Sequence, residues 1–175
     1  VNNTASASTS GTATLKFTQA NTTAGGSIIS GRDSNYSGGD NRDSYMAFQT
    51  ALNAYDTEKM RINSTGNVGI GITPNAGWPA STDFRVLQIG TGIALWGRGS
   101  GDEERGGLTA NLYHDGSAFK YLSTGVVTSY EQNDGQHIFK SAASGSAGAT
   151  ATVLTKMTIS NTGNVGIGES SPDSY

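Results

Sequence analysis

Hydrophobic residues along this chain recur at every second position rather than at the spacing of a helix. Pairs separated by one residue run through most of its length, namely Leu15/Phe17, Met46/Phe48, Leu87/Ile89, Ile93/Leu95 and Met157/Ile159. Alternation of this kind places one set of side chains on one face of a β-strand. Residues 44–56 also fit a helical face, but the close spacing of Met46 and Phe48 favours a strand. The pattern therefore predicts an all-β chain.

Two Asp-Gly turns interrupt the alternation in the second half of the chain. They lie in His114-Asp115-Gly116-Ser117 and in Asn133-Asp134-Gly135-Gln136. Asp-Gly supplies the positive φ that a two-residue type I′ hairpin turn requires. We therefore expect two hairpins, with Leu112 opposite Phe119 in the first and Tyr130 opposite Phe139 in the second.

The heptapeptide TGNVGIG occurs twice, at residues 65–71 and 162–168. The copy extends upstream, because Lys59–Gly71 aligns with Lys156–Gly168 without a gap and ten of the thirteen positions are identical. An internal repeat marks a recurring structural unit. We expect two tandem units, residues 1–79 and 80–175, each ending in one copy of the repeat.

Each repeat has the sequence of a type I turn followed by a glycine bulge. This register places Met, Ile and Val side chains on one face of a hairpin, in the facing pairs Met60–Ile70, Ile62–Val68, Met157–Ile167 and Ile159–Val165. The opposite face carries Gly69, Gly71, Gly166 and Gly168, so we expect a neighbouring strand to lie against it. A pair of strands this short is marginal alone and needs a surface to pack against.

Composition narrows the function classes. Hydrophobic residues make up 34% of the chain, charged residues 14%, and 25 positions are glycine. Because so few residues can form a hydrophobic core, we expect the apolar residues to be buried in contacts between copies of the chain. The net charge of −3 opposes nucleic-acid binding, and no apolar run is long enough to insert into a membrane. The absence of cysteine removes disulfides and thiolate chemistry.

The repeat and its flanks resemble a known class of proteins. EKMRINSTGNVGIGITP and TKMTISNTGNVGIGESSP resemble a segment that recurs in tail-fibre and tail-spike proteins of tailed bacteriophages, marine phages especially. Residues 115–148 look like the stretch that precedes this segment in the same proteins. Together with residues 87–97, the resemblance covers most of Leu87–Pro172 and a shorter part of the first half.

The resemblance implies an elongated, β-rich homotrimer, with protomers side by side or intertwined, in an extracellular virion fibre that attaches the particle to its host. Its partners would be further copies of itself, other virion tail proteins, and a glycan or protein of the host surface. The trimer core would be formed by the hairpin residues Met60, Ile62, Val68, Ile70, Met157, Ile159, Val165 and Ile167. The chain would be a cleaved product or a fragment, because no C-terminal chaperone domain follows the second repeat.

Three other classes share these features. A polysaccharide-degrading tail spike would need two carboxyl groups across a sugar cleft, and the acidic cluster Asp102-Glu103-Glu104 does not by itself provide such a pair. A capsid decoration or extracellular filament protein would have the same composition. A calcium-stabilised adhesin would use the loop that begins at Asp33. We expect no enzymatic activity and no cofactor.

The segment 31–43 is the expected receptor-contacting loop. It matches the first half of a calcium loop, but Ser44 stands where the bidentate Glu is needed, so no metal site is expected. The residues that we expect to contact a receptor are Asp33, Asn35, Tyr36, Asp40 and Asp43.

The remaining candidates have a structural interpretation. His114 and His137 lack partners at ligand spacing and should be exposed beside their turns. Trp78 and Trp96 should be buried between strands or subunits rather than presented to a sugar. The low-complexity segments 2–11, 31–43 and 141–152 are expected to be a frayed start and two exposed loops.

Overall fold

The computed structural model describes residues 11–19, 24–34, 42–53, 55–79, 84–99 and 105–173. In these ranges the chain forms fourteen strands and no helix, which confirms the all-β prediction. The strands are β1 (Thr12–Gln19), β2 (Ala24–Arg32), β3 (Ser44–Leu52), β4 (Tyr55–Ile62), β5 (Val68–Ile70), β6 (Phe84–Ile89), β7 (Ile93–Arg98), β8 (Arg105–Ala110), β9 (Leu112–His114), β10 (Phe119–Tyr121), β11 (Gly125–Asn133), β12 (Gln136–Gly145), β13 (Leu154–Ile159) and β14 (Val165–Ile167).

The chain divides into two compact units, Val1–Pro74 (unit 1) and Asn75–Tyr175 (unit 2). The division falls shortly before Pro79, where the repeat pattern placed the boundary. Residues 75–79 belong to unit 2 because Trp78 packs there against Phe84, with ring centroids 6.1 Å apart.

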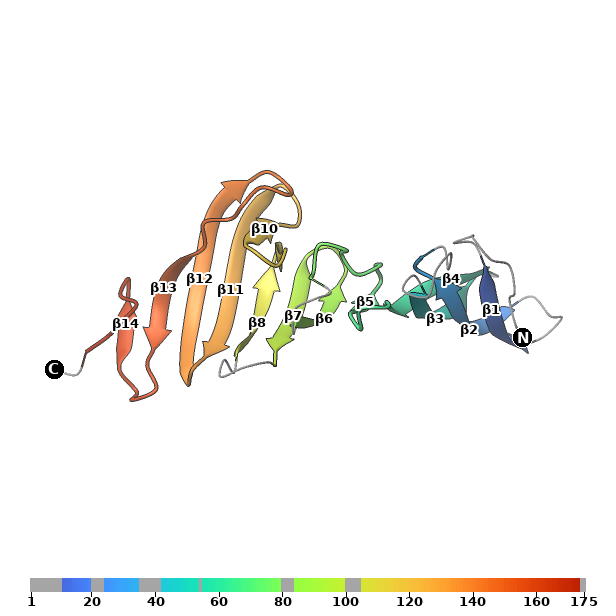
Figure 1. Ribbon diagram of the computed structural model, residues 1–175, viewed down its shortest axis with the longest axis horizontal. Helices are drawn as coiled ribbons and strands as arrows, with labels where there is room; N and C mark the ends of the chain where they lie inside the picture. The colour runs from blue at the N-terminus through green and yellow to red at the C-terminus, as the bar shows by residue number, and fades with distance from the viewer. Residues whose placement is uncertain are drawn as a thin grey trace. The chain divides into compact units, whose positions relative to one another are not determined.

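In unit 1, strands β1 to β5 lie side by side in chain order and pair antiparallel (Figure 1). Residues 44–52 form a strand, as the spacing of Met46 and Phe48 predicted. The register between β3 and β4 shifts after Phe48, which faces Met60, while the next residue faces Glu58. Lys59 is therefore the extra residue of a β-bulge.

In unit 2, the sheet order is β6-β7-β8-β11-β12-β13-β14, and every one of these pairs is antiparallel. The turn between β11 and β12 is the expected two-residue turn, since Asp134 and Gly135 both have positive φ, 49° and 76°. Tyr130 faces Phe139 as predicted. A second bulge lies between β12 and β13, where Phe139 faces Met157.

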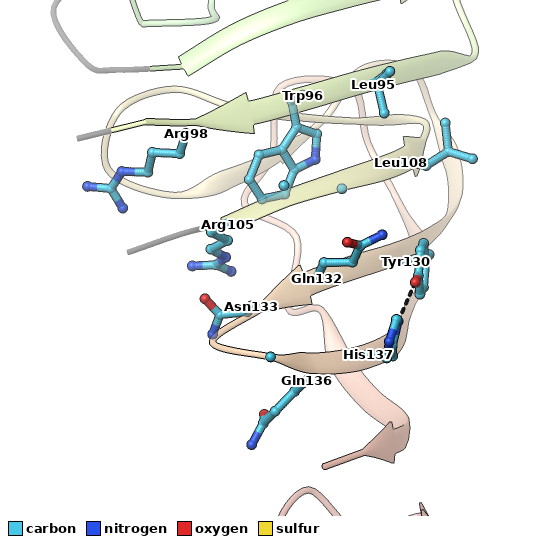
Figure 2. Close-up of a pocket in the computed structure, with 13 residues that line it drawn as sticks. Leu95, Trp96, Arg98, Arg105, Leu108, Tyr130, Gln132, Asn133, Gln136 and His137 are labelled. Atoms are coloured by element: carbon cyan, nitrogen blue, oxygen red, sulfur yellow. Dashed lines mark hydrogen bonds between the residues drawn. The ribbon is translucent and has the colours of Figure 1, made fainter. Parts of the chain in front are cut away.

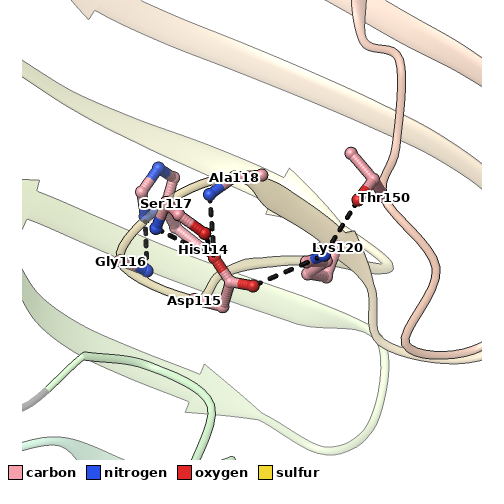
Figure 3. A network of polar contacts seen from close by, with 7 residues as sticks. All are labelled: His114, Asp115, Gly116, Ser117, Ala118, Lys120 and Thr150. Atoms are coloured by element: carbon pink, nitrogen blue, oxygen red, sulfur yellow. Dashed lines mark hydrogen bonds and ion pairs between the residues drawn. The ribbon is translucent and has the colours of Figure 1, made fainter.

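The first Asp-Gly hairpin, β9–β10, differs from the prediction. Leu112 faces Tyr121 instead of Phe119, because the loop has four residues rather than two. Asp115 sets this length: its Oδ1 accepts hydrogen bonds from the backbone amides of Ser117 and Ala118, at 2.9 and 2.8 Å (Figure 3). These hydrogen bonds stabilise the carboxylate and hold the pKa of Asp115 well below its usual range.

The low-complexity segments are partly ordered into the sheet. Residues 141–145, which were expected to form a loop, continue β12, and that expectation is wrong. The ring of Tyr121 lies against Gly145, and its hydroxyl donates a hydrogen bond to the Ala143 carbonyl oxygen at 2.6 Å. A small residue there lets an aromatic ring cover the strand.

Two apolar clusters cover one face of the unit 2 sheet. The first contains Trp78, Phe84, Val86, Ala94 and Trp96, and the second contains Leu112, Tyr121, Val127 and Ala151. Both tryptophans are only 2% exposed, so their predicted burial is confirmed. The fully buried Gln88 attaches the segment before β6 to this face, because its Oε1 accepts a hydrogen bond from the Asn75 amide at 2.9 Å.

Candidate functional site

One face of the unit 1 sheet, the apolar face, presents hydrophobic side chains across all five strands. Cross-strand partners share a face, so the pairings define one continuous row and a second, more mixed row. The first row is Leu15, Ile28, Phe48, Met60 and Ile70, and the second is Ala13, Ser30, Met46, Ile62 and Val68. Phe17 lies two residues after Leu15 in β1 and so shares this face; Leu15 is 59% and Phe17 53% exposed.

The opposite face of unit 1 is mainly polar, although Ile29 and Ala47 also lie on it. The Ser27 hydroxyl lies 3.0 Å from Gln49 Oε1 and 3.1 Å from Asp56 Oδ2. Arg61 makes a two-pronged ion pair with Glu58 and stacks 3.6 Å above the ring of Tyr45. The hydrogen bonds from the guanidinium to Glu58 raise its pKa. These hydrogen bonds and this ion pair satisfy the polar side chains of this face, so the face needs no second layer to cover it.

Unit 1 consequently lacks an apolar core of its own. Among its described residues, Ala47 is the one hydrophobic residue classed as buried. A β-sheet with one apolar face is stable when a second layer covers that face. The described part of unit 1 contains no such layer.

Unit 2 has a matching surface, which we call the apolar band. It is a row of seven facing residues, one on each strand of the sheet: Leu87, Leu95, Leu108, Tyr130, Phe139, Met157 and Ile167. Leu95 is 53% and Ile167 82% exposed. The apolar band lies on the face opposite the two buried clusters, because its residues alternate with core residues such as Val86 and Trp96.

The eight hairpin residues expected to form a trimer core all lie on these two surfaces or beside them. Their pairing is confirmed: Met60 faces Ile70, Ile62 faces Val68, and the second repeat shows the same four-residue arrangement. Alternation in β7, β8 and β11 marks further members, such as Leu95 and Leu108, that the repeat alone did not identify.

The repeat itself is explained by local structure. Asn63 and Asn67 close the first turn through a 3.0 Å backbone hydrogen bond, and Gly66 has the positive φ of the expected glycine bulge, 82°. Ser160 and Asn164 do the same in the second copy, at 2.9 Å. The Asn and Gly residues shared by the two copies thus serve the hairpin backbone.

The chain that follows each hairpin, and not a neighbouring strand as expected, covers Gly69 and Gly166. Among the described residues, nothing covers Gly71 and Gly168, where a Cβ atom would meet no atom within 4 Å. A Cβ atom at Gly69 would overlap the Ile72 carbonyl oxygen and lie 2.8 Å from Pro74 Cδ. A Cβ at Gly166 would lie 2.7 Å from the Glu169 carbonyl oxygen. Glycine is required at both positions because another backbone segment approaches too closely for a side chain.

Of the five residues expected to contact a receptor, Asp33 and Asp43 are described, while Asn35, Tyr36 and Asp40 lie outside the described residues. Asp33 Oδ2 accepts a hydrogen bond from the Ser64 amide at 2.8 Å, so this carboxylate holds the turn of the first repeat. The Asp33 amide also donates to the Asp43 carbonyl oxygen at 2.9 Å. Both side chains are exposed at the base of the loop.

The buried carboxylate of unit 2, Glu131, is paired with two basic side chains. Glu131 is fully buried, and its Oε2 lies 2.8 Å from both Arg105 Nη2 and Lys140 Nζ. Burial alone would raise the pKa of this carboxyl, but the hydrogen bonds from Lys140 and Arg105 outweigh it and lower the pKa overall. A carboxylate with a lowered pKa and two cationic partners is ionised near neutral pH and is therefore unsuited to general acid catalysis there.

The two histidines differ in environment. His137 is exposed, as expected, and its Nδ1 lies 2.5 Å from the Tyr130 hydroxyl. His114 was expected to be exposed, but it is half-buried and stacks on Phe84 with ring centroids 5.0 Å apart. Burial lowers the pKa of His114, and Nδ1 accepts a hydrogen bond from the Gly116 amide at 3.0 Å.

A hollow lies at one end of β7, β8, β11 and β12 (Figure 2). Its volume is about 700 Å³. The lining combines cations, amides and aromatic rings: Arg98, Arg105, Gln132, Asn133, Gln136, His137, Tyr130, Trp96, Leu95 and Leu108, with Gly106, Gly107 and Gly135.

The described residues offer neither a metal site nor a membrane-spanning helix. They contain no group of three or more His, Asp or Glu side chains placed to hold a metal ion. The same residues contain no helix that could span a bilayer. The acidic cluster 102–104 lies outside the ranges that the structure describes.

Comparison of the chain with protein-family models, with curated proteins and with solved structures found no match.

Proposed function

We propose that this chain is a structural segment of a virion fibre, of the tail-fibre type, that assembles with copies of itself as a homotrimer. The observation that carries the proposal is the uncovered apolar face of unit 1, in a unit whose described part has one buried hydrophobic residue. Burying one Val, Leu, Ile, Phe or Met side chain contributes about 1.5–3 kcal/mol. The two rows of the apolar face hold eight such side chains, so the face strongly favours association. A second copy supplies the missing layer.

The chemistry of the two surfaces favours association with copies of this chain. The apolar face holds no charged residue among the pairs that define its two rows, and the apolar band holds none either. Depletion of charge with enrichment of aromatic residues and Met is typical of the core of a permanent interface. Three copies would then place their apolar faces around a common axis, side by side or intertwined.

The repeat supports a fibre rather than a single globular head. The same hairpin, with the same bulge and the same fold-back of the following chain, ends both units. Repeated units that each present an uncovered apolar surface are the basis of elongated assemblies. The role is therefore mechanical: the fibre carries loops such as 31–43 to a glycan or protein on the host surface, and joins other tail proteins of the virion. We propose no enzymatic activity.

Immunogold electron microscopy tests the virion assignment. Antibodies raised against the 175-residue chain should label the tail appendages of particles that encode it, and excess chain should reduce adsorption of those particles to host cells. Labelling of the capsid surface would favour the decoration-protein alternative, and release of reducing ends from host polysaccharide would favour the degrading-spike alternative.

A further inference from the structure

We propose that Asp134, at the tip of the β11–β12 hairpin, is a site of spontaneous modification, at which the main chain isomerises to isoaspartate through a cyclic succinimide. The sequence contains two Asp-Gly pairs, Asp115-Gly116 and Asp134-Gly135. The fold protects the first pair and leaves both reacting groups of the second pair accessible. This chemistry needs neither the virion setting nor self-assembly.

The reaction takes place within the dipeptide and needs no enzyme or cofactor. The backbone nitrogen of the glycine attacks Cγ of the neutral aspartic acid, an N–Cγ bond forms, and the nitrogen proton and one carboxyl oxygen leave as water. Water then opens the ring at either carbonyl carbon. Opening at Cγ restores aspartate, whereas opening at the α-carbonyl carbon gives isoaspartate, whose main chain runs through Cβ and Cγ. Glycine favours ring closure because it has no side chain to obstruct the approach.

Both reacting groups of the second pair are accessible. Asp134 and Gly135 are exposed and form the two-residue turn between Asn133 and Gln136 (Figure 2). Among the described residues, no group accepts a hydrogen bond from the Gly135 amide, and none donates one to the Asp134 carboxylate. The nucleophilic nitrogen and the electrophilic carbon are therefore both available.

Ring closure requires the peptide group between Asp134 and Gly135 to rotate out of the type I′ turn. Asp134 has a φ of 49°, in the left-handed region that is unfavourable for a residue with a side chain. Exposed loop tips open locally at a lower free-energy cost than the strands that they join. The strain at Asp134 and the absence of hydrogen bonds from the pair both lower the cost of this rotation.

The first pair is held at both reacting groups (Figure 3). Asp115 Oδ1 accepts hydrogen bonds from the amides of Ala118 and Ser117 and from the Ser117 hydroxyl, at 2.8, 2.9 and 2.8 Å. These bonds hold the pKa of Asp115 well below its usual range, so little of the neutral acid is present for attack. The Gly116 amide, the nucleophile of this pair, donates a hydrogen bond to His114 Nδ1 at 3.0 Å. Isomerisation at Asp115 should therefore be slow in the folded chain.

The product would disturb the hairpin at its tip. Isoaspartate adds one carbon atom to the main chain of a two-residue turn, and the length of that turn sets the register of β11 and β12. This register places Tyr130 opposite Phe139 in the apolar band. The turn also lies beside the second repeat, since a Cβ at Gly135 would lie 3.2 Å from Asn161 Cβ. An isomerised chain should therefore unfold at a lower temperature than the fresh chain.

Peptide mapping by mass spectrometry, after timed incubation of the folded full chain, tests the inference. Trypsin releases the two pairs in separate peptides, residues 106–120 and 121–140. The isoaspartyl form of each peptide separates by chromatography and accepts a methyl group from an isoaspartyl methyltransferase. We expect isoaspartate to form about tenfold faster at Asp134 than at Asp115, because the hydrogen bonds at Asp115 must break first. Equal rates, or a faster reaction at Asp115, would overturn the proposal.

The same chain unfolded in urea is the matched control. Both pairs then lack tertiary structure, so their rates should agree within about twofold. Reaction at Asp134 only after unfolding would show that the type I′ turn prevents ring closure, and it would overturn the proposal. The variant Asp134→Glu cannot form the five-membered ring at this position and should remove methyl acceptance from peptide 121–140. Unchanged methyl acceptance in this variant would place the isoaspartate at another residue and contradict the site.

Discussion

The backbone amide of Gly71 donates a hydrogen bond to the carbonyl oxygen of Lys59 over 2.8 Å, and Gly168 makes the equivalent bond to Lys156 over 2.9 Å. Each lysine is the extra residue of the bulge in its sheet. The bulge turns the lysine carbonyl oxygen toward the glycine that follows the hairpin, which donates the hydrogen bond. The repeated sequence therefore specifies a turn, a bulge and an exit path as one unit.

The first prediction concerns the glycines at which the exiting chain approaches the hairpin. Gly166→Ala should lower the free energy of unfolding by about 1–3 kcal/mol, because a Cβ there would lie 2.7 Å from the Glu169 carbonyl oxygen. Gly69→Ala should be at least as damaging, since the closest atom is again a backbone carbonyl oxygen, that of Ile72. Urea denaturation measures both changes.

Gly92→Ala is the control for this pair. A Cβ at Gly92 meets no atom within 4 Å, and its φ is not in the left-handed region. Its free energy of unfolding should stay within about 0.5 kcal/mol of the original. Equal effects at positions 92 and 166 would refute the close-approach explanation.

The strand register of the hairpins could be predicted from the sequence, but the covering of their glycines could not. The repeat gave the correct cross-strand pairs, such as Met60 with Ile70, because turn type and glycine position determine register over a few residues. The covering of Gly69 could not be predicted in the same way. It depends on the path of Ile72 and Pro74 after the hairpin. That path is set by tertiary packing, and the segment has no alternation of apolar residues from which it could be predicted.

The second prediction tests the apolar face of unit 1. Leu15→Glu combined with Phe17→Glu should abolish or strongly weaken self-association, because two charges would be buried without partners. Thr14→Glu combined with Thr18→Glu is the matched control: these exposed residues alternate with Leu15 and Phe17 and so lie on the opposite face of the same strand. Analytical ultracentrifugation compares the two. Equal loss of association in both would show that the surface does not matter.

The third prediction concerns the buried carboxylate Glu131. Its pKa is lowered in the folded state, so its ionisation contributes stability above about pH 4.3, the usual value of an unfolded Glu, and this contribution is lost as the pH falls through the folded pKa. Glu131→Gln should cost about 3–5 kcal/mol at pH 7, because Arg105 and Lys140 lose their partner. The variant should also lose this acid-dependent step, as measured by urea denaturation from pH 2 to 7. A step of the same size in the variant would assign it to other carboxyl groups.

The fourth prediction concerns His114. Its pKa is lowered in the folded state, so the folded chain binds a proton less readily than the unfolded chain, and stability should decline as the pH falls below about 6.5. Protonation would also remove the acceptor that Nδ1 offers to the Gly116 amide. His114→Phe keeps the ring stacked on Phe84 and should flatten the stability profile between pH 7 and 5. NMR titration of the His114 ring checks the direction of the shift, and a raised pKa would contradict it.

His114 also marks a limit of sequence reasoning. The Asp-Gly pair predicted a two-residue turn, and on that basis the histidine would be exposed. Asp115 instead accepts two backbone amides and widens the loop to four residues, which moves Phe119 opposite His114 and brings the imidazole onto Phe84. The hydrogen bonds of the Asp115 side chain thus determine the register of β9 and β10, which the turn preference of the Asp-Gly dipeptide did not predict.

The proposed self-assembly is best tested by the native mass of the 175-residue chain, measured by light scattering after gel filtration over a dilution series. We expect a persistent mass of three times 18.0 kDa, because the apolar face of unit 1 and the apolar band of unit 2 need copies of the chain to cover them. A folded chain that stays at 18.0 kDa at all concentrations would contradict the homotrimer, since both surfaces would then be stable in water without a partner.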